Sequence, residues 1–185
     1  MSNSNKSGGK RILLMISGSI AAFKAASLAS LLVKDGHAVQ TVCSDGGKAF
    51  IGEAALEGLT GRPVLTDMFE RGRALDHIRL AEDHDLLLLY PASANRITRL
   101  RAGLADDLIG ALFLANNFRK PWWIAPAMNS NMFAHPAVTD ALDQLERWGC
   151  RILPTGEGRL ACGDVGYGRL LEPEATFALI DEAFA

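Results

Sequence analysis

Three continuous apolar runs constrain the fold of this chain more than any other feature. They span residues 11–17 (RILLMIS), 85–89 (DLLLL) and 121–125 (PWWIA). Runs of this length without polar alternation are typical of strands that are buried on both faces of a parallel sheet. Weaker strand patterns follow at residues 38–43, 63–65 and 151–153.

Helical patterns lie between these strands, and the polar segment 67–77 is expected to be a loop. The expected helices cover residues 19–35, 44–59, 94–102, 107–116, 139–148 and 172–184. Strands that alternate with helices indicate parallel βαβ units with right-handed crossovers. We therefore predict an α/β fold, a three-layer doubly wound parallel sheet of the flavodoxin-like or Rossmann-like kind.

Composition limits the class of protein. The chain has 185 residues, of which 49% are hydrophobic and 22% charged, as expected for one globular domain over residues 11–185. Residues 1–10 are polar and are expected to form a disordered tail rather than a signal peptide. A net charge of −2 and the lack of a long apolar run argue against nucleic-acid and membrane partners.

The cysteines indicate the compartment. Three widely spaced cysteines without a CxxC pair indicate reduced thiols in the cytoplasm and argue against a zinc site. We therefore expect no metal.

Two turns rich in small residues follow two of the buried runs. They read YPASAN at 90–95 and APAMNSNM at 125–132. Because Pro, Ala, Ser and Asn are poor strand formers, both strands are expected to end where these turns begin. Ligands of α/β sheets bind at the carboxyl edge of the strands, so the two turns predict a site for a flat ligand. The alternative is that each is an ordinary connection with a helix cap.

Two further turns suggest the ligand. Gly18-Ser19-Ile20 follows the first strand, and Ser44-Asp45-Gly46 follows the second. Helix N-termini at such turns offer free N–H groups to a phosphate. Neither turn is a GxGxxG motif, so a mononucleotide such as FMN is favoured over a dinucleotide, with simple helix capping as the alternative.

The stretch 156–169 holds five glycines and Cys162 and has no apolar periodicity. Structureless segments of this length are usually functional or disordered. Glycine at this density permits hinged closure, so we expect a loop that can close over a site. The alternative is a floppy surface loop, which is less favoured because a helical pattern resumes directly after the stretch.

Taken together, these motifs resemble those of the homo-oligomeric flavin-containing cysteine decarboxylases. The segments that carry the resemblance are GSIAA at 18–22, HI at 77–78, PASAN at 91–95, PAMNSNM at 126–132 and LACGDVGYGRLLEP at 160–173. The resemblance runs from about residue 11 to residue 173. It implies FMN as cofactor, a homo-oligomer (trimer or dodecamer) with the flavin at a subunit interface, and a small cysteine-derived substrate, 4'-phospho-N-pantothenoylcysteine of coenzyme A biosynthesis.

The resemblance also implies roles for individual residues. His77 and Cys162 match the catalytic histidine and the proton-donating cysteine, and Asn129 and Met132 match the substrate-contacting turn. The residues expected to bind the cofactor are Gly18, Ser19, Ile20, Ser44, Asp45, Gly46, Ser93, Ala94, Asn95, Arg96 and Ala127.

The chain departs from the family in three respects. Arg96 stands where Thr is usual, and Phe133 stands where Trp is usual. Most bacterial members continue into a ligase domain, and since this chain ends at Ala185 we expect that activity to be absent from it.

The chemistry explains why such residues are needed. Loss of CO2 from a cysteine amide requires an electron sink, which a flavin provides by oxidising the CH2–SH group to a thioaldehyde. A histidine suits thiol deprotonation, and an amide holds the carboxylate without the ground-state stabilisation of a cation. The cysteine motif favours the pantothenate substrate over the alternative, a peptidyl-cysteine oxidative decarboxylase that makes aminoenethiols. A non-catalytic flavin-binding regulatory subunit is the alternative from another class.

Overall fold

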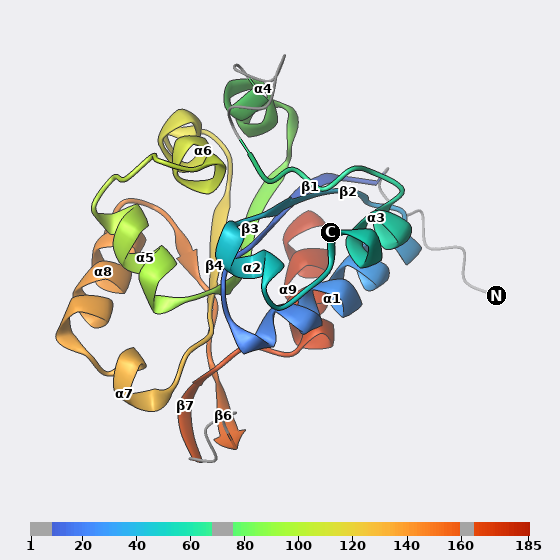
Figure 1. The fold of residues 1–185 in the computed structure, drawn as a ribbon. Coiled ribbons are helices and arrows are strands. Elements are labelled where there is room, and N and C mark those ends of the chain that lie inside the picture. The colour runs from blue at the N-terminus through green and yellow to red at the C-terminus, as the bar shows by residue number, and fades with distance from the viewer. Residues whose placement is uncertain (1–8, 68–75, 160–164) are drawn as a thin grey trace.

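A five-stranded parallel sheet forms the centre of the protein (Figure 1). The computed structural model describes residues 9–67, 76–159 and 165–185. The strand order is β2-β1-β3-β4-β5, and each neighbouring pair is parallel. This order is that of the flavodoxin-like fold, so the predicted α/β class and parallel sheet are confirmed.

The elements follow one another as alternating strands and helices. The sheet strands are β1 Arg11–Ile16, β2 Ala38–Cys43, β3 Leu86–Ala92, β4 Trp122–Pro126 and β5 Arg151–Ile152. The helices are η1 Ile20–Ala22, α1 Phe23–Lys34, α2 Asp45–Lys48, α3 Glu53–Thr60, α4 Asp76–Asp83, α5 Ala94–Arg101, α6 Leu108–Asn116, α7 Ser130–Phe133, α8 Pro136–Arg147 and α9 Pro173–Phe184. A separate antiparallel pair consists of β6 Gly156–Arg159 and β7 Val165–Arg169.

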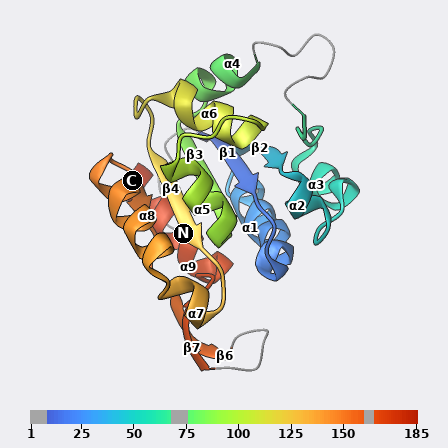
Figure 2. The ribbon, with the colours of Figure 1, turned by 60° about the vertical axis from the view of Figure 1, so that its left-hand side comes forward.

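Helices cover both faces of the sheet, which gives three layers. Helices α1, α3 and α9 pack together on one face, whereas α5 packs with α8 and α4 with α6 on the other (Figures 1 and 2). Each face has its own cluster of buried side chains, and residues of β1 alternate between the two. Burial on both faces is the reason why the strands appear as unbroken apolar runs.

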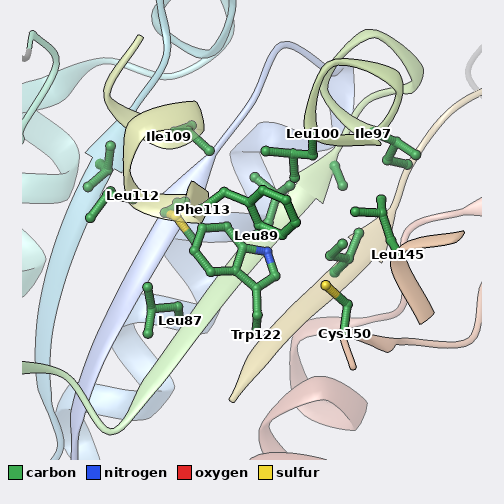
Figure 3. Packing of buried hydrophobic residues seen from close by; sticks show 14 of the residues in the cluster. Leu87, Leu89, Ile97, Leu100, Ile109, Leu112, Phe113, Trp122, Leu145 and Cys150 are labelled. Atoms are coloured by element: carbon green, nitrogen blue, oxygen red, sulfur yellow. The ribbon is translucent and has the colours of Figure 1, made fainter. Parts of the chain in front are cut away.

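The two adjacent tryptophans of β4 separate to opposite faces, as strand geometry requires. Trp122 is 1% exposed and packs edge-on against Phe113 of α6, with ring centroids 5.1 Å apart (Figure 3). Trp123 belongs to the cluster on the other face, and the Arg151 guanidinium lies 4.3 Å from its ring centroid. Both rings therefore serve packing.

Both strands that precede the small-residue turns end later in the sequence than predicted. β3 continues through Tyr90 and Pro91 to Ala92, and β4 includes Pro126. The carbonyl groups at the end of β3 still accept hydrogen bonds from neighbouring segments: Pro91 O accepts from Ser17 N (3.2 Å), and Ala92 O accepts from Ala127 N (2.9 Å). A proline at a strand end loses only its donor, so the prediction that the strands end earlier was wrong.

Three helical segments also differ from the prediction. The single helix expected over 44–59 is divided into α2 and α3, because the glycines at 46 and 47 weaken the helix and Gly52 caps the second one. α4 begins inside the segment expected to be a loop. Its Leu80 and Ala81 pack in the same core cluster as residues of α6, which α4 contacts. The short helix α7 was not predicted.

The glycine-rich stretch is also more ordered than predicted, since its described parts form the β6–β7 hairpin. Met128 N donates to Gly168 O (2.9 Å), and the Ser130 hydroxyl donates to Tyr167 O (3.1 Å). Glycine in a strand permits this close approach of another backbone. The hairpin is thus attached to the turn at residues 128–130, and residues 160–164 between its strands lie outside the described residues.

The N-terminal tail was predicted over residues 1–10, and residues 1–8 lie outside the described residues. Lys10 hydrogen-bonds to the last residue before β2 and to the first residue of β2: its N–H donates to His37 Nδ1 (3.1 Å), and its carbonyl accepts from Ala38 N (2.9 Å). In the part of the chain that the structure describes, no helix is both long and apolar enough to cross a lipid bilayer.

Candidate active site

A cavity of about 490 Å³ opens at the carboxyl edge of the sheet. Its walls come from the ends of β1 and β2, from α2, and from the starts of α5 and α6. The predicted site residues that line it are Gly18, Ser44, Asp45, Gly46, Ser93, Ala94, Asn95, Arg96 and Met132. A volume of this size lies in the range of small-molecule and cofactor sites, about 300–1,000 Å³.

Two glycines bring the first two turns together in the cavity wall. A Cβ atom on Gly18 would lie 3.1 Å from backbone atoms of Gly46, and one on Gly46 would lie 3.3 Å from the Cα atom of Gly18. Side chains at either position would press the turns apart and fill space beside the cavity. The turns at Gly18 and Gly46, which were both predicted to bind a phosphate, are therefore neighbours in space.

Hydroxyl groups hold the turns in place. Ser44 accepts from Gly47 N (3.2 Å) at the start of α2, and Ser93 accepts from Arg96 N at the start of α5. The buried Ser17 hydroxyl donates to Pro91 O (2.8 Å) and accepts from Ser93 N (2.9 Å), which fixes the end of β1 to the end of β3. Ser17 lines the cavity but was not predicted as a site residue, since it stands inside a strand pattern.

Arg96 and Asp107 form a charged pair in the cavity wall. Arg96 is 5% exposed, its Nη1 donates to Asp107 Oδ1 (2.8 Å), and its Nη2 pairs with Asp107 Oδ2. Asp107 Oδ1 also accepts from Gly110 N (2.9 Å) and so caps α6. Burial favours the neutral acid, but the hydrogen bonds from Arg96 and Gly110 outweigh it and lower the pKa of Asp107.

Asp107 stands where the sequence predicted a helix to begin, and it caps α6. Its place in the cavity was missed, because Arg96 lies eleven residues away on a different helix. An arginine inside a turn of small residues was the available signal.

Cys43 is the thiol in the described wall of the cavity. Burial raises its pKa to about 11, so the thiol stays protonated at neutral pH. It contributes a small apolar surface, as free cysteines often do.

Other predicted residues are not among those that line the cavity. Ala127 is buried, and its carbonyl accepts from the Ser19 hydroxyl (3.4 Å), which joins the first turn to the end of β4. Ile20 is 59% exposed. Asn129 caps α7 through its Oδ1, which accepts from Met132 N (2.8 Å). The Asn129 side-chain amide nitrogen is not required by that cap.

One of the two predicted catalytic residues, His77, lies apart from the residues that line the cavity. His77 is half-buried in the first turn of α4, and it is not among the residues that line the cavity. Figures 1 and 2 both show α4 and α7 at opposite ends of the molecule. Cys162 lies outside the described residues.

The features of the cavity fit a flat mononucleotide such as FMN. Two glycine turns leave room for a phosphate, the start of α5 supplies small side chains, and Arg96 Nε is a buried donor without a partner among the described residues. Unpaired buried donors are rare, and a ligand acceptor is one way to satisfy them.

Comparison with known proteins identifies the family. The family described as Flavoprotein matches residues 1–185. The chain belongs to the flavoprotein family. This flavoprotein is 42% identical over 179 residues to the coenzyme A biosynthesis bifunctional protein CoaBC of Vibrio cholerae, with 96% of the chain covered. It is 39% identical over 178 residues to the protein of the same name from Bacillus subtilis, with 95% covered.

The chain spans less than half the length of these relatives: 44% of the Vibrio cholerae protein and 43% of the Bacillus subtilis protein. The flavoprotein chain also resembles solved structures over nearly its whole length. A cysteine mutant of PPC decarboxylase complexed with pantothenoylaminoethenethiol has a TM-score of 0.85 at 28% identity, with 95% of this chain and 98% of that chain covered. The FMN binding protein AtHal3 has a TM-score of 0.79 at 30% identity with the same coverage.

Proposed function

We propose that this flavoprotein uses FMN to decarboxylate 4'-phospho-N-pantothenoylcysteine to 4'-phosphopantetheine, a step of coenzyme A biosynthesis. The observation that carries this proposal is the cavity itself, which gathers nine of the predicted site residues at the carboxyl edge of a flavodoxin-like sheet. Relatives named for coenzyme A biosynthesis and a similar structure named PPC decarboxylase support the choice of substrate.

We infer that residues 11–185 act as one FMN-binding unit. The turns at Gly18–Ile20 and Ser44–Gly46 would hold the phosphate, and Ser93 to Arg96 would hold the ring, with Ala127 behind them. When bound, FMN supplies a two-electron acceptor that can oxidise the substrate CH2–SH group and later return the electrons.

The protein residues would supply binding and proton transfers around the substrate. Asn129 can donate an amide N–H to the substrate carboxylate while its oxygen caps α7. This interaction orients the carboxylate without the charge of a cation, which would oppose its departure as CO2. His77 would accept the thiol proton, and Cys162 would later donate a proton to carbon.

A second copy of the chain would complete the site. The placement of α4 and α7 at opposite ends of the molecule in both views favours His77 and Asn129 of one chain serving different substrates (Figures 1 and 2). We therefore propose a homo-oligomer, trimeric or built from trimers, in which one subunit supplies His77 and its neighbour supplies Asn129. Buried free thiols at Cys43 and Cys150 support a reducing, cytoplasmic location.

Competition between two substrates tests the proposal. The protein is supplied with phosphopantothenoylcysteine and with a peptide that ends in cysteine, and products are measured by mass spectrometry. We expect CO2 loss from the pantothenate substrate alone. Preference for the peptide would favour the peptidyl-cysteine oxidative decarboxylase, and FMN binding without turnover of either would favour a regulatory subunit.

The variant Asn129→Asp tests the role of the amide in the same assay. Aspartate is as good a helix cap as asparagine, so α7 is kept. Its negative charge would repel the substrate carboxylate, and we expect kcat/KM to fall by about 100-fold or more, equivalent to about 3 kcal/mol, with unchanged FMN affinity. An unchanged kcat/KM would show that Asn129 does not contact the carboxylate.

A further inference from the structure

The Arg96 side chain has one donor that the protein does not use. Both terminal nitrogens of the guanidinium face the Asp107 carboxylate, whereas Nε is buried and has no hydrogen-bond partner among the described residues. The residue lines the cavity. An unsatisfied buried donor lowers stability, and an acceptor that came within hydrogen-bond distance of Nε would remove this cost.

Asp107 fixes the direction in which that donor can act. Its carboxylate accepts hydrogen bonds from the terminal nitrogens of the guanidinium and is itself held by the Gly110 N–H at the start of α6. A planar guanidinium held by two parallel hydrogen bonds has no freedom to turn. The Nε–H bond is therefore preorganised before any ligand arrives.

The charge of the pair indicates which kind of acceptor is suited. The Arg96 cation and the Asp107 anion neutralise each other, so the pair presents a directed N–H dipole rather than a net positive charge. A phosphate dianion gains little from such a pair, whereas a neutral carbonyl oxygen is matched by a neutral donor. The turns at Gly18 and Gly46, which also line the cavity, leave room for the phosphate away from the Arg96–Asp107 pair.

We propose that Arg96 donates a hydrogen bond from Nε to a carbonyl oxygen of the flavin ring, and that Asp107 is the positioning residue that aims this donor. This inference rests on the proposed FMN site. It assigns ring recognition to a position where Thr is usual in the family, and it gives the Asp107 carboxylate a role beyond the cap of α6.

Flavin titrations of the apoprotein test the inference without any measurement of turnover. The double variant Arg96→Met with Asp107→Asn removes both charges together, so no unpaired charge is left buried, and asparagine is as good a cap for α6 as aspartate. The matched control is Arg101→Met, because Arg101 lies on the same helix but pairs with Asp140 (3.3 Å) on the surface, outside the cavity. Affinities for FMN and for riboflavin, the bound flavin absorption spectrum and the apoprotein Tm are compared.

We expect the double variant to bind FMN and riboflavin more weakly by the same factor, about 3- to 10-fold for one neutral hydrogen bond. The visible absorption bands of the bound flavin should also shift, while Arg101→Met should match the wild type in affinity and spectrum. Weaker binding of FMN with unchanged riboflavin affinity would overturn the inference, since it would place Arg96 at the phosphate. Unchanged affinity and spectrum for both flavins would overturn it as well, leaving Arg96 a purely structural residue. Failure of the wild type to bind either flavin would instead reject the proposed function.

Discussion

Gly168 shows how much of the site depends on single residues. Its φ of 104° lies in the region that favours glycine, and a Cβ atom there would lie 2.6 Å from Met128 O. The carbonyl oxygen of Gly168 also accepts from Met128 N. The missing side chain is therefore what lets the hairpin lie directly on the turn that carries Asn129.

Alanine at this position is expected to separate the hairpin from the turn. Gly149 provides a matched control, because its φ is 105° but nothing lies within 4 Å of an added Cβ atom. Gly149→Ala should lower the free energy of unfolding by about 1–3 kcal/mol from backbone strain alone. Gly168→Ala should cost more than this and should also reduce decarboxylation.

Urea unfolding and decarboxylation assays of the two variants test whether the hairpin must contact the turn. Equal stability losses, together with wild-type turnover in both, would show that the contact between the hairpin and the turn is dispensable.

At the scale of the elements, α4 joins His77, the proposed catalytic base, to the core. His84 follows its last residue, is 7% exposed, and its Nδ1 lies 2.7 Å from Leu80 O. Burial lowers the pKa of His84, since it disfavours the charged ring. The folded protein therefore holds this histidine neutral where the unfolded chain would protonate it.

The stability of the protein should consequently depend on pH in a defined direction. The contribution of neutral His84 is fully present above the unfolded pKa, about 6.5, and is lost as the pH falls from there through the lower folded pKa. We expect the free energy of unfolding to fall by at most about 1.4 kcal/mol per pH unit over that window. His84→Gln should reduce this slope, and chemical unfolding at a series of pH values measures it; an identical slope in the variant would exclude His84 as the cause.

Sequence patterns predicted the elements that carry a strong apolar pattern and missed those that depend on tertiary contacts. The apolar runs in β1, β3 and β4 identify a doubly buried sheet, since only burial on both faces removes polar alternation. The β6–β7 hairpin is different: its glycines carry no hydrophobic signal, and its hydrogen bonds to Met128 and Ser130 come from a distant turn. α4 was missed because only two of its residues, Leu80 and Ala81, pack in the core cluster, which is too few to give a helical apolar pattern.

The site shows the same division. The turns at Gly18, Ser44 and Ser93 could be placed at one sheet edge because the carboxyl ends of parallel strands meet there. The pairing of Arg96 with Asp107 could not, because it depends on the packing of α5 beside the loop that precedes α6.

At the scale of the whole molecule, the placement of α4 and α7 at opposite ends is the basis for the proposed site shared between subunits (Figures 1 and 2). Two variants, His77→Asn and Asn129→Asp, should each be nearly inactive. Mixed oligomers formed by co-expression should regain activity, since random assortment in a ring gives about one interface in four with both residues intact. If both residues served the same chain, no mixed site would be intact and activity would stay absent.

The central claim, a complete FMN-dependent decarboxylation, is tested most directly in one anaerobic sample. The FMN-loaded protein is mixed with phosphopantothenoylcysteine, and the product mass and the visible flavin absorption are recorded together. We predict a product lighter by CO2 alone, with the flavin still oxidised after many turnovers. A product that has lost CO2 and two hydrogens with stoichiometric flavin bleaching, or no product at all, would contradict the account.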